Sequence, residues 1–103
     1  MSVLVSSDAS FLTDVSAPKV VVKYYADWCG SCKLFAPKFK RLSDDERFKD
    51  YVFIDVNAEH NPEARKMAGV ETLPYFAVFE QGVLKSKIST SKEDAFIEFL
   101  SQK

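Results

Sequence analysis

Residues 19–25, a lysine, three valines, a second lysine and two tyrosines, constrain the fold more than any other part of this chain. β-Branched and aromatic side chains favour strands, and a nearly continuous apolar run is typical of a strand buried on both faces. Such a strand needs helices on both sides of its sheet. The segment therefore predicts a central strand of a parallel or mixed sheet in an α/β protein.

The rest of the chain alternates strand patterns with amphipathic helix patterns. An apolar stripe at helical spacing, with basic side chains opposite, predicts a helix over 32–46. Asn61-Pro62 opens another helix with proline at its first position, and Gly82 sits in a hairpin turn. Ser91 and Asp94 have capping-box spacing before the last helix. We expect one domain over residues 1–103, with strands at 3–5, 19–25, 51–56, 75–79 and 83–88 and a short first helix at 8–15.

Charge and hydropathy exclude several classes of protein. The 14 basic and 15 acidic side chains give a net charge of −1, which provides no basic field for nucleic acid. No apolar stretch approaches the ~20 residues that cross a bilayer. The first residues lack a basic stretch followed by a long apolar one, so we expect no signal peptide and a cytoplasmic protein. We also expect the protein to be a monomer. No phosphate loop or nicotinamide fingerprint is present, so we expect no bound cofactor.

The chain has two cysteines, Cys29 and Cys32, separated only by Gly30 and Ser31. A zinc site needs about four ligands, and only His60 and carboxylates are available to complete one, so we expect no metal. A disulfide across so short a loop removes little entropy from the unfolded chain and is a poor staple. A structural disulfide and a pair of inert buried thiols nevertheless stay open beside a redox function.

The position of the pair, between a strand and a helix, favours the redox function. At a helix N-terminus, Cys29 can accept backbone N–H groups and faces the positive end of the helix dipole. Hydrogen bonds to a charged acceptor contribute about 1.5–3 kcal/mol, more than the dipole's ~0.3–1 kcal/mol, so they dominate the lowering of the thiol pKa. Cys32 lies one turn further on and can attack a mixed disulfide at Cys29. Gly30 and Ser31 are small and let a partner chain approach.

These residues resemble the thioredoxin family. The resemblance covers nearly the whole chain and rests on residues 20–33, Pro37, Asn61-Pro62, Gly69-Val70, Thr72-Leu73-Pro74 and Gly82. It implies a thioredoxin-like fold, with a central mixed β-sheet flanked by helices on both faces.

The resemblance also implies residue functions. Cys29 is the nucleophile, Cys32 is the resolving thiol, and Trp28 forms a flat wall beside them. Pro74 is cis and faces the dithiol, and the Leu73 backbone pairs with an extended substrate segment. Only about 5–6% of X–Pro bonds are cis in folded proteins, so the residues alone predict an ordinary trans turn at Pro74.

Three departures from the family pattern concern the substrate groove. Ser31 stands where thioredoxins usually carry proline, which leaves the redox poise open. Tyr75 follows Pro74 where threonine is common. Ser89-Thr90-Ser91 replaces a loop that usually presents glycine to the substrate, so we expect the Thr90 side chain to narrow or reshape the groove.

A fourth departure concerns charge. Six residues before Cys29 the family usually has a buried acid that takes the proton of the resolving thiol, but this chain has Lys23. Asp55 occupies the position on the neighbouring strand where many thioredoxins have lysine. We therefore expect a charge-swapped, buried Lys23–Asp55 pair behind Cys32, with Asp55 or an associated water as proton acceptor. The alternative is that Lys23 extends to solvent and Asp55 is simply an acid at a strand end.

The sequence thus predicts a thioredoxin-like protein-disulfide reductase. Its partners would be disulfide-containing client proteins and an upstream disulfide reductase similar to thioredoxin reductase, and its redox-active group the Cys29–Cys32 disulfide. One alternative is a thiol oxidase or isomerase in an oxidising compartment. Another is a binding module that uses a thioredoxin scaffold to hold one client.

Overall fold

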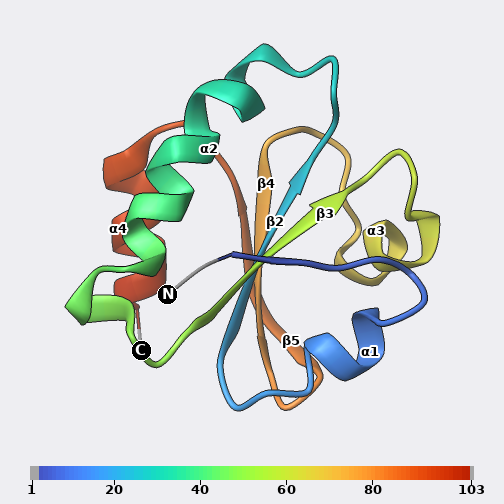
Figure 1. The fold of residues 1–103 in the computed structure, drawn as a ribbon, viewed down its shortest axis with the longest axis horizontal. Helices are drawn as coiled ribbons and strands as arrows, with labels where there is room; N and C mark the ends of the chain where they lie inside the picture. Colours follow the sequence, from blue (N-terminus) through green and yellow to red (C-terminus); the bar gives the residue numbers. More distant parts are fainter. Residues whose placement is uncertain (1–2, 103) are drawn as a thin grey trace.

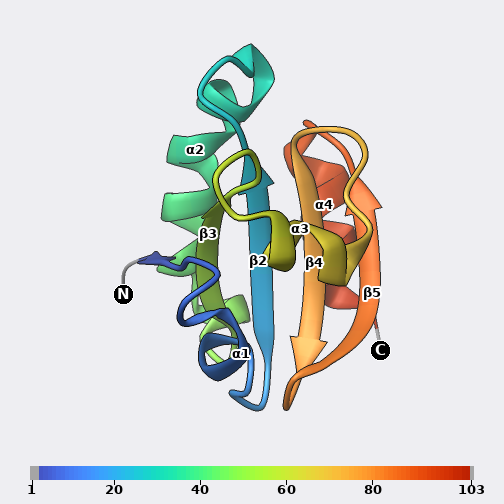
Figure 2. The same ribbon diagram turned by 90° about the vertical axis from the view of Figure 1, so that its right-hand side faces the viewer.

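One mixed sheet of five strands organises the chain, in the order β1-β3-β2-β4-β5 (Figure 2). The computed structural model describes residues 3–102, so the first two residues of the expected leaderless N-terminus and the last residue of the expected domain lie outside the described part. The strands are β1 (Leu4–Val5), β2 (Val20–Tyr25), β3 (Val52–Asn57), β4 (Tyr75–Glu80) and β5 (Val83–Ser89). The helices are α1 (Phe11–Asp14), α2 (Gly30–Ser43), the 3₁₀ helix η1 (Glu46–Phe48), α3 (Pro62–Ala68) and α4 (Glu93–Ser101).

The central strand β2 lies between a parallel and an antiparallel neighbour, as the sequence predicts. It pairs with β3 in parallel register and with β4 in antiparallel register. Val20, Val22 and Tyr24 belong to the apolar cluster on one face of the sheet, and Val21 belongs to the cluster on the other. Both faces are therefore covered, and the predicted α/β architecture is confirmed.

The helices form two outer layers around the sheet (Figure 1). α1 and α3 cover one face, where Phe11, Ala64 and Ala68 join its apolar cluster. α2 and α4 cover the other face, where Phe35 and Phe96 pack edge to face with ring centres 5.4 Å apart. None of the described helices is long and apolar enough to cross a membrane.

The starts of α1 and α4 differ from the sequence prediction, in both cases because of capping contacts, and α2 begins at Gly30, two residues before the predicted start at Cys32. Asp8 was expected inside the first helix, but its carboxylate accepts the backbone N–H groups of Glu63 and Ala64 and so caps α3 instead. The prediction that Ser91 and Asp94 form a capping box is wrong, because Lys92 is the N-cap residue of α4. The backbone N–H of Lys92 donates to the Thr90 hydroxyl. A single side chain oxygen committed elsewhere is enough to move a helix start.

Candidate active site

The Cys29–Cys32 pair forms a disulfide at the N-terminus of α2. Cys29 is the N-cap residue, and its Sγ accepts the backbone N–H of Cys32 at 3.2 Å. The two residues are 5% and 2% exposed, respectively. The predicted position at a helix start, with a backbone donor directed at the sulfur, is therefore present in the structure.

Two side chains flank the disulfide on the outer surface. The Trp28 ring is 66% exposed, and its indole N–H donates to Glu59 Oε2 at 2.6 Å. Glu59 lies in the loop after β3, so this bond links the redox loop to a distant part of the chain. Ser31 Oγ lies 3.5 Å from Cys29 Sγ. Gly30 is exposed between these groups and adds no side chain.

The loop before β4 also packs against the disulfide. The Leu73–Pro74 peptide bond is cis, and Leu73 packs against the small apolar cluster that contains both cysteines. Ser89 Oγ donates to the Pro74 carbonyl at 3.4 Å and lies 2.6 Å from Thr72 Oγ1. Since a serine hydroxyl has one hydrogen, Thr72 is the donor in the second contact. The end of β5 is thus tied to the loop that carries the cis proline.

Thr90 lies just beyond this contact. Its hydroxyl accepts the N–H of Lys92, and within residues 3–102 no hydrogen bond or apolar contact joins it to either cysteine.

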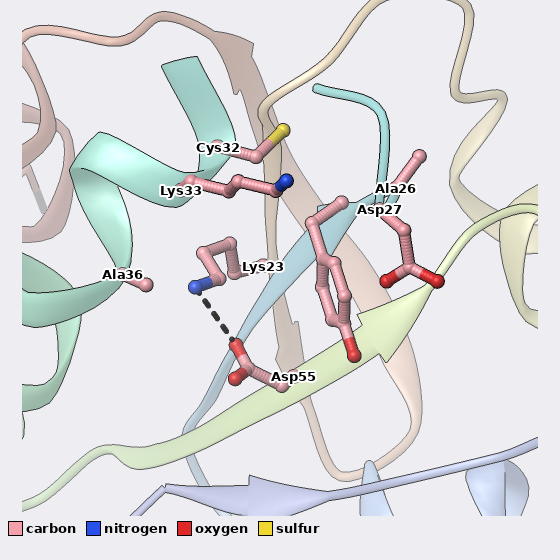
Figure 3. A pocket seen from close by; sticks show the side chains of 8 residues that line it. Lys23, Ala26, Asp27, Cys32, Lys33, Ala36 and Asp55 are labelled. Carbon is pink, nitrogen blue, oxygen red and sulfur yellow. Dashed lines mark ion pairs between the residues drawn. The ribbon is translucent and has the colours of Figure 1, made fainter. Parts of the chain in front are cut away.

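A pocket of about 260 Å³ opens beneath Cys32 between α2 and the ends of β2 and β3 (Figure 3). Its charged lining consists of Lys23, Asp27, Lys33 and Asp55, and the remaining wall includes Tyr25. A space of this size can hold several water molecules beside the resolving sulfur.

Lys23 and Asp55 form an ion pair in this pocket, with Nζ 3.3 Å from Oδ1 (Figure 3). Lys23 is only 3% exposed, so the alternative in which it extends to solvent is wrong. Its ammonium also lies 5.0 Å from the ring centre of Phe39 and 5.6 Å from that of Tyr25. Stacking against two rings offsets part of the cost of burying the charge.

Burial also changes the proton affinities of the acidic groups in the pocket. It raises the pKa of the Asp55 carboxyl above its usual value, and the Lys23 ammonium opposes part of this rise. Burial likewise raises the pKa of the Tyr25 hydroxyl, with further contributions from the charges of Asp55 and Asp27. Asp55 Oδ1, the oxygen that faces the Lys23 ammonium at 3.3 Å, is buried and has no hydrogen-bond donor in good alignment among residues 3–102.

A disulfide at a helix start, packed against the residue before a cis proline, agrees with the arrangement that the resemblance implied. The family model described as Thioredoxin matches residues 2–102. The chain belongs to the thioredoxin family. Thioredoxin-1 of Schizosaccharomyces pombe is 38% identical over 79 residues, which are 76% of this chain and 75% of that protein.

Chloroplastic members of the thioredoxin family are similar over a smaller share of their own length. A thioredoxin F-type of Brassica napus is 35% identical over 80 residues, which are 76% of this chain but 42% of that protein. Thioredoxin F of Oryza sativa is 31% identical over 84 residues, which are 81% of this chain but 44% of that protein. The chain therefore spans less than half the length of these chloroplastic relatives.

Solved thioredoxin structures share the whole fold. The thioredoxin of Plasmodium falciparum superposes with a TM-score of 0.88 at 26% identity, covering 96% of this chain and 97% of that one. The thioredoxin of Malassezia sympodialis superposes with a TM-score of 0.89 at 23% identity, covering 98% of this chain and 92% of that one. The predicted thioredoxin-like fold is confirmed.

Several groups at this thioredoxin site were not predicted. Asp27 and Lys33 are adjacent in sequence to Trp28 and Cys32, so their proximity could have been inferred from the motif itself. Glu59 and the Thr72–Ser89 contact depend on loop conformations, for which the sequence carries no local signal. His60, weighed as a metal ligand, is exposed, and within residues 3–102 no three His, Cys, Asp or Glu side chains are grouped as around a metal ion.

Proposed function

We propose that this chain is a thiol–disulfide oxidoreductase that reduces disulfides in client proteins. The observation that carries the proposal is the Cys29–Cys32 disulfide at the start of α2, with a backbone N–H directed at the Cys29 sulfur. Donors placed at this sulfur stabilise a thiolate more than a thiol, so they favour a reactive Cys29.

The proposed reaction has two exchange steps. The Cys29 thiolate bonds to one sulfur of the client disulfide, and the other client sulfur leaves as a thiolate. The Cys32 thiolate then attacks the Cys29 sulfur, breaks the mixed disulfide and releases the second client thiolate. The client gains two electrons and two protons, and the dithiol becomes the Cys29–Cys32 disulfide.

The second step requires Cys32 to lose its proton, and we assign this proton to Asp55. Cys32 and Asp55 line the same pocket, which has room for water between them. The raised pKa of Asp55 makes it a better proton acceptor than an exposed aspartate. Lys23 acts as a positioning residue, because its ammonium lies 3.3 Å from the carboxylate.

Docking of the client is assigned to the surface around the disulfide. Trp28 supplies an exposed aromatic wall, Gly30 and Ser31 leave room for the client backbone, and Leu73 beside Pro74 offers backbone groups to an extended client segment. Thr90, whose hydroxyl accepts the N–H of Lys92, is assigned to the same surface as a residue that limits which clients fit.

The proposal also implies a setting and a source of electrons. A protein-disulfide reductase works in a reducing compartment such as the cytoplasm. No other cofactor is required in the two exchange steps, so the disulfide is reset by an upstream disulfide reductase similar to thioredoxin reductase.

Reduction of insulin by dithiothreitol tests the proposal. The protein should accelerate insulin reduction, and Cys29→Ser should abolish the acceleration because no nucleophile remains. Cys32→Ser should instead accumulate a mixed disulfide with insulin, since Cys29 can attack but nothing resolves the product. If insulin is reduced no faster with the unaltered protein than with dithiothreitol alone, the proposal is contradicted. That result would favour the alternative of a binding module that holds one client.

The equilibrium with glutathione separates a reductase from an oxidase or isomerase. The reduction potential of a reductase dithiol must lie well below that of the glutathione pool, whereas the potentials of oxidases and isomerases lie above it. We expect the Cys29–Cys32 disulfide to persist in millimolar reduced glutathione. Ready reduction by glutathione would assign the oxidising alternative.

A further inference from the structure

The hydroxyl of Tyr75 is bonded to the last residue of α3. Tyr75 is the first residue of β4, and its hydroxyl donates to the Ala68 carbonyl at 3.2 Å. Both residues are buried. Because α3 ends at Ala68, no backbone N–H within the helix reaches this carbonyl. The Tyr75 hydroxyl therefore supplies a hydrogen bond that the helix itself cannot make.

This hydrogen bond closes the base of a loop that reaches the disulfide. Ala68 and Tyr75 directly flank residues 69–74, which connect α3 to β4. Leu73 in this loop packs against the small apolar cluster that contains both cysteines. The backbone of Tyr75 is itself fixed, because it pairs with both β2 and β5. The bond therefore ties the start of the loop to a rigid part of the sheet.

The loop has open space beside it. A cavity of about 430 Å³ has Gly69, Val70 and Glu71 of the loop in its lining, together with Arg65 of α3. Arg65 Nε donates to the Val70 carbonyl at 3.1 Å, but this side chain is only half-buried, so water competes for the contact. The cavity gives the loop room to shift once the bond at its base is removed.

We propose that the Tyr75 hydroxyl is a positioning group for client docking, because it holds the loop against α3 and thereby sets the position of the Leu73 backbone. This inference rests on the proposed function, in which an extended client segment pairs with that backbone. Hydrogen bonds depend steeply on distance and angle, so a shift of Leu73 weakens client binding. Tyr75 belongs to the apolar cluster under α1 and α3 rather than to the one around the cysteines, so the exchange chemistry itself is left unchanged.

Tyr24 provides a matched control for Tyr75. It is also buried, and its hydroxyl also donates to a carbonyl of α3, that of Ala64 at 2.8 Å. The two tyrosine rings pack edge to face with their centres 6.2 Å apart. Ala64 lies inside the helix rather than next to the loop. Tyr24→Phe and Tyr75→Phe therefore each remove one buried hydroxyl from the same helix, and only the second releases the loop.

The experiment measures the rate of insulin reduction at saturating dithiothreitol as a function of insulin concentration. Tyr75→Phe should raise the KM for insulin about fivefold and leave kcat within about twofold, because it weakens docking without touching the reacting sulfurs. Tyr24→Phe should leave both constants within about twofold. An unchanged KM in Tyr75→Phe would overturn the inference. An equal rise of KM in both variants would do the same, because it would show that a general loss of stability is responsible.

Amide hydrogen exchange gives a second measurement that needs no client protein. The Val70 N–H, near the start of the loop, donates to the Arg65 carbonyl at 3.3 Å. Its exchange should be about fivefold faster in Tyr75→Phe than in Tyr24→Phe, because local opening of the loop becomes easier. Equal exchange rates in the two variants would also refute the inference. If Val70 responds as expected but the unaltered protein does not reduce insulin, the result counts against the proposed function and not against the anchoring of the loop.

Discussion

At the residue scale, Lys23 illustrates what the sequence can and cannot predict about the site. Its partner is predictable, because in the parallel register of β2 and β3 Lys23 lies directly beside Asp55. The burial of the Lys23 side chain is not predictable, because it depends on where α2 places the Phe39 ring. The centre of this ring lies 5.0 Å from the Lys23 ammonium. Cys29, Cys32 and Trp28 are easier to predict, since they are contiguous and need no tertiary information.

Asp55→Asn should change how the stability of the protein depends on pH. The pKa of Asp55 is raised even though the Lys23 ammonium lies 3.3 Å away, so the cost of burying the ionised carboxylate exceeds what the ion pair returns. A neutral asparagine avoids this cost, so we expect the variant to be at least as stable as the original protein in urea unfolding near pH 7. Asp27→Asn is the matched control, because Asp27 lines the same pocket but is exposed, and we expect a change below about 0.5 kcal/mol.

The sign of the pH effect follows from the raised pKa of Asp55. A carboxyl that binds its proton more tightly when folded stabilises the protein fully below its unfolded-state pKa of 3.8, and this contribution is lost as the pH rises through the folded pKa. The original protein should show this loss and Asp55→Asn should not. Single-turnover reduction of insulin should also lose its Asp55-dependent pH response. An identical stability profile and rate profile in the variant would remove Asp55 from the proposed proton transfer.

At the scale of elements, hydropathy patterns predict the order of strands and helices, and capping contacts decide their ends. The hairpin between β4 and β5 follows directly from sequence, since Gly82 has φ of 84°, a conformation that glycine adopts without strain. The apolar stripe predicts helix only from Cys32, but α2 begins at Gly30, with Cys29 as the N-cap at the helix start where the position of the cysteine pair places it. Long-range caps such as Asp8 on α3 cannot be found by scanning local sequence.

The cap of η1 gives a prediction at this scale. Asp45 accepts hydrogen bonds from the Arg47 guanidinium and backbone, and these hold its pKa to about 2. Arg47→Ala should raise the Asp45 pKa partway toward the usual 3.8, because the backbone N–H stays in place. The lowered pKa means that Asp45 stabilises the fold above pH 3.8 and that this contribution disappears as the pH falls through about 2.

Carboxyl NMR titration measures this change directly. Lys49→Ala removes a positive charge directly after η1 that neither bonds to Asp45 nor lowers its pKa, so the Asp45 titration should stay where it is. Equal shifts in the two variants would mean that general charge, rather than the cap, lowers the Asp45 pKa.

At the scale of the whole molecule, the sheet separates two apolar cores that have different compositions. The face under α1 and α3 is filled largely by valine, alanine and tyrosine, and the Tyr24 hydroxyl donates to the Ala64 carbonyl at 2.8 Å. The face under α2 and α4 is dominated by phenylalanine. The active-site helix α2 rests on this second core, so its position depends on aromatic packing.

Phe96 lies at the centre of the aromatic core and links α4 to the sheet and to α2. Its ring centre is 4.4 Å from that of Phe76, 5.4 Å from Phe35 and 5.8 Å from Phe39. Phe96→Ala should cost about 3–5 kcal/mol, because it removes a buried ring and leaves a cavity that the sheet cannot close. For a domain of this size the loss should lower Tm by at least about 10 °C in calorimetry. Leu12→Ala is the control, because it truncates a side chain that is 70% exposed and should change Tm little. A comparable drop in Tm in both variants would show that Phe96 does not anchor the core beneath α2.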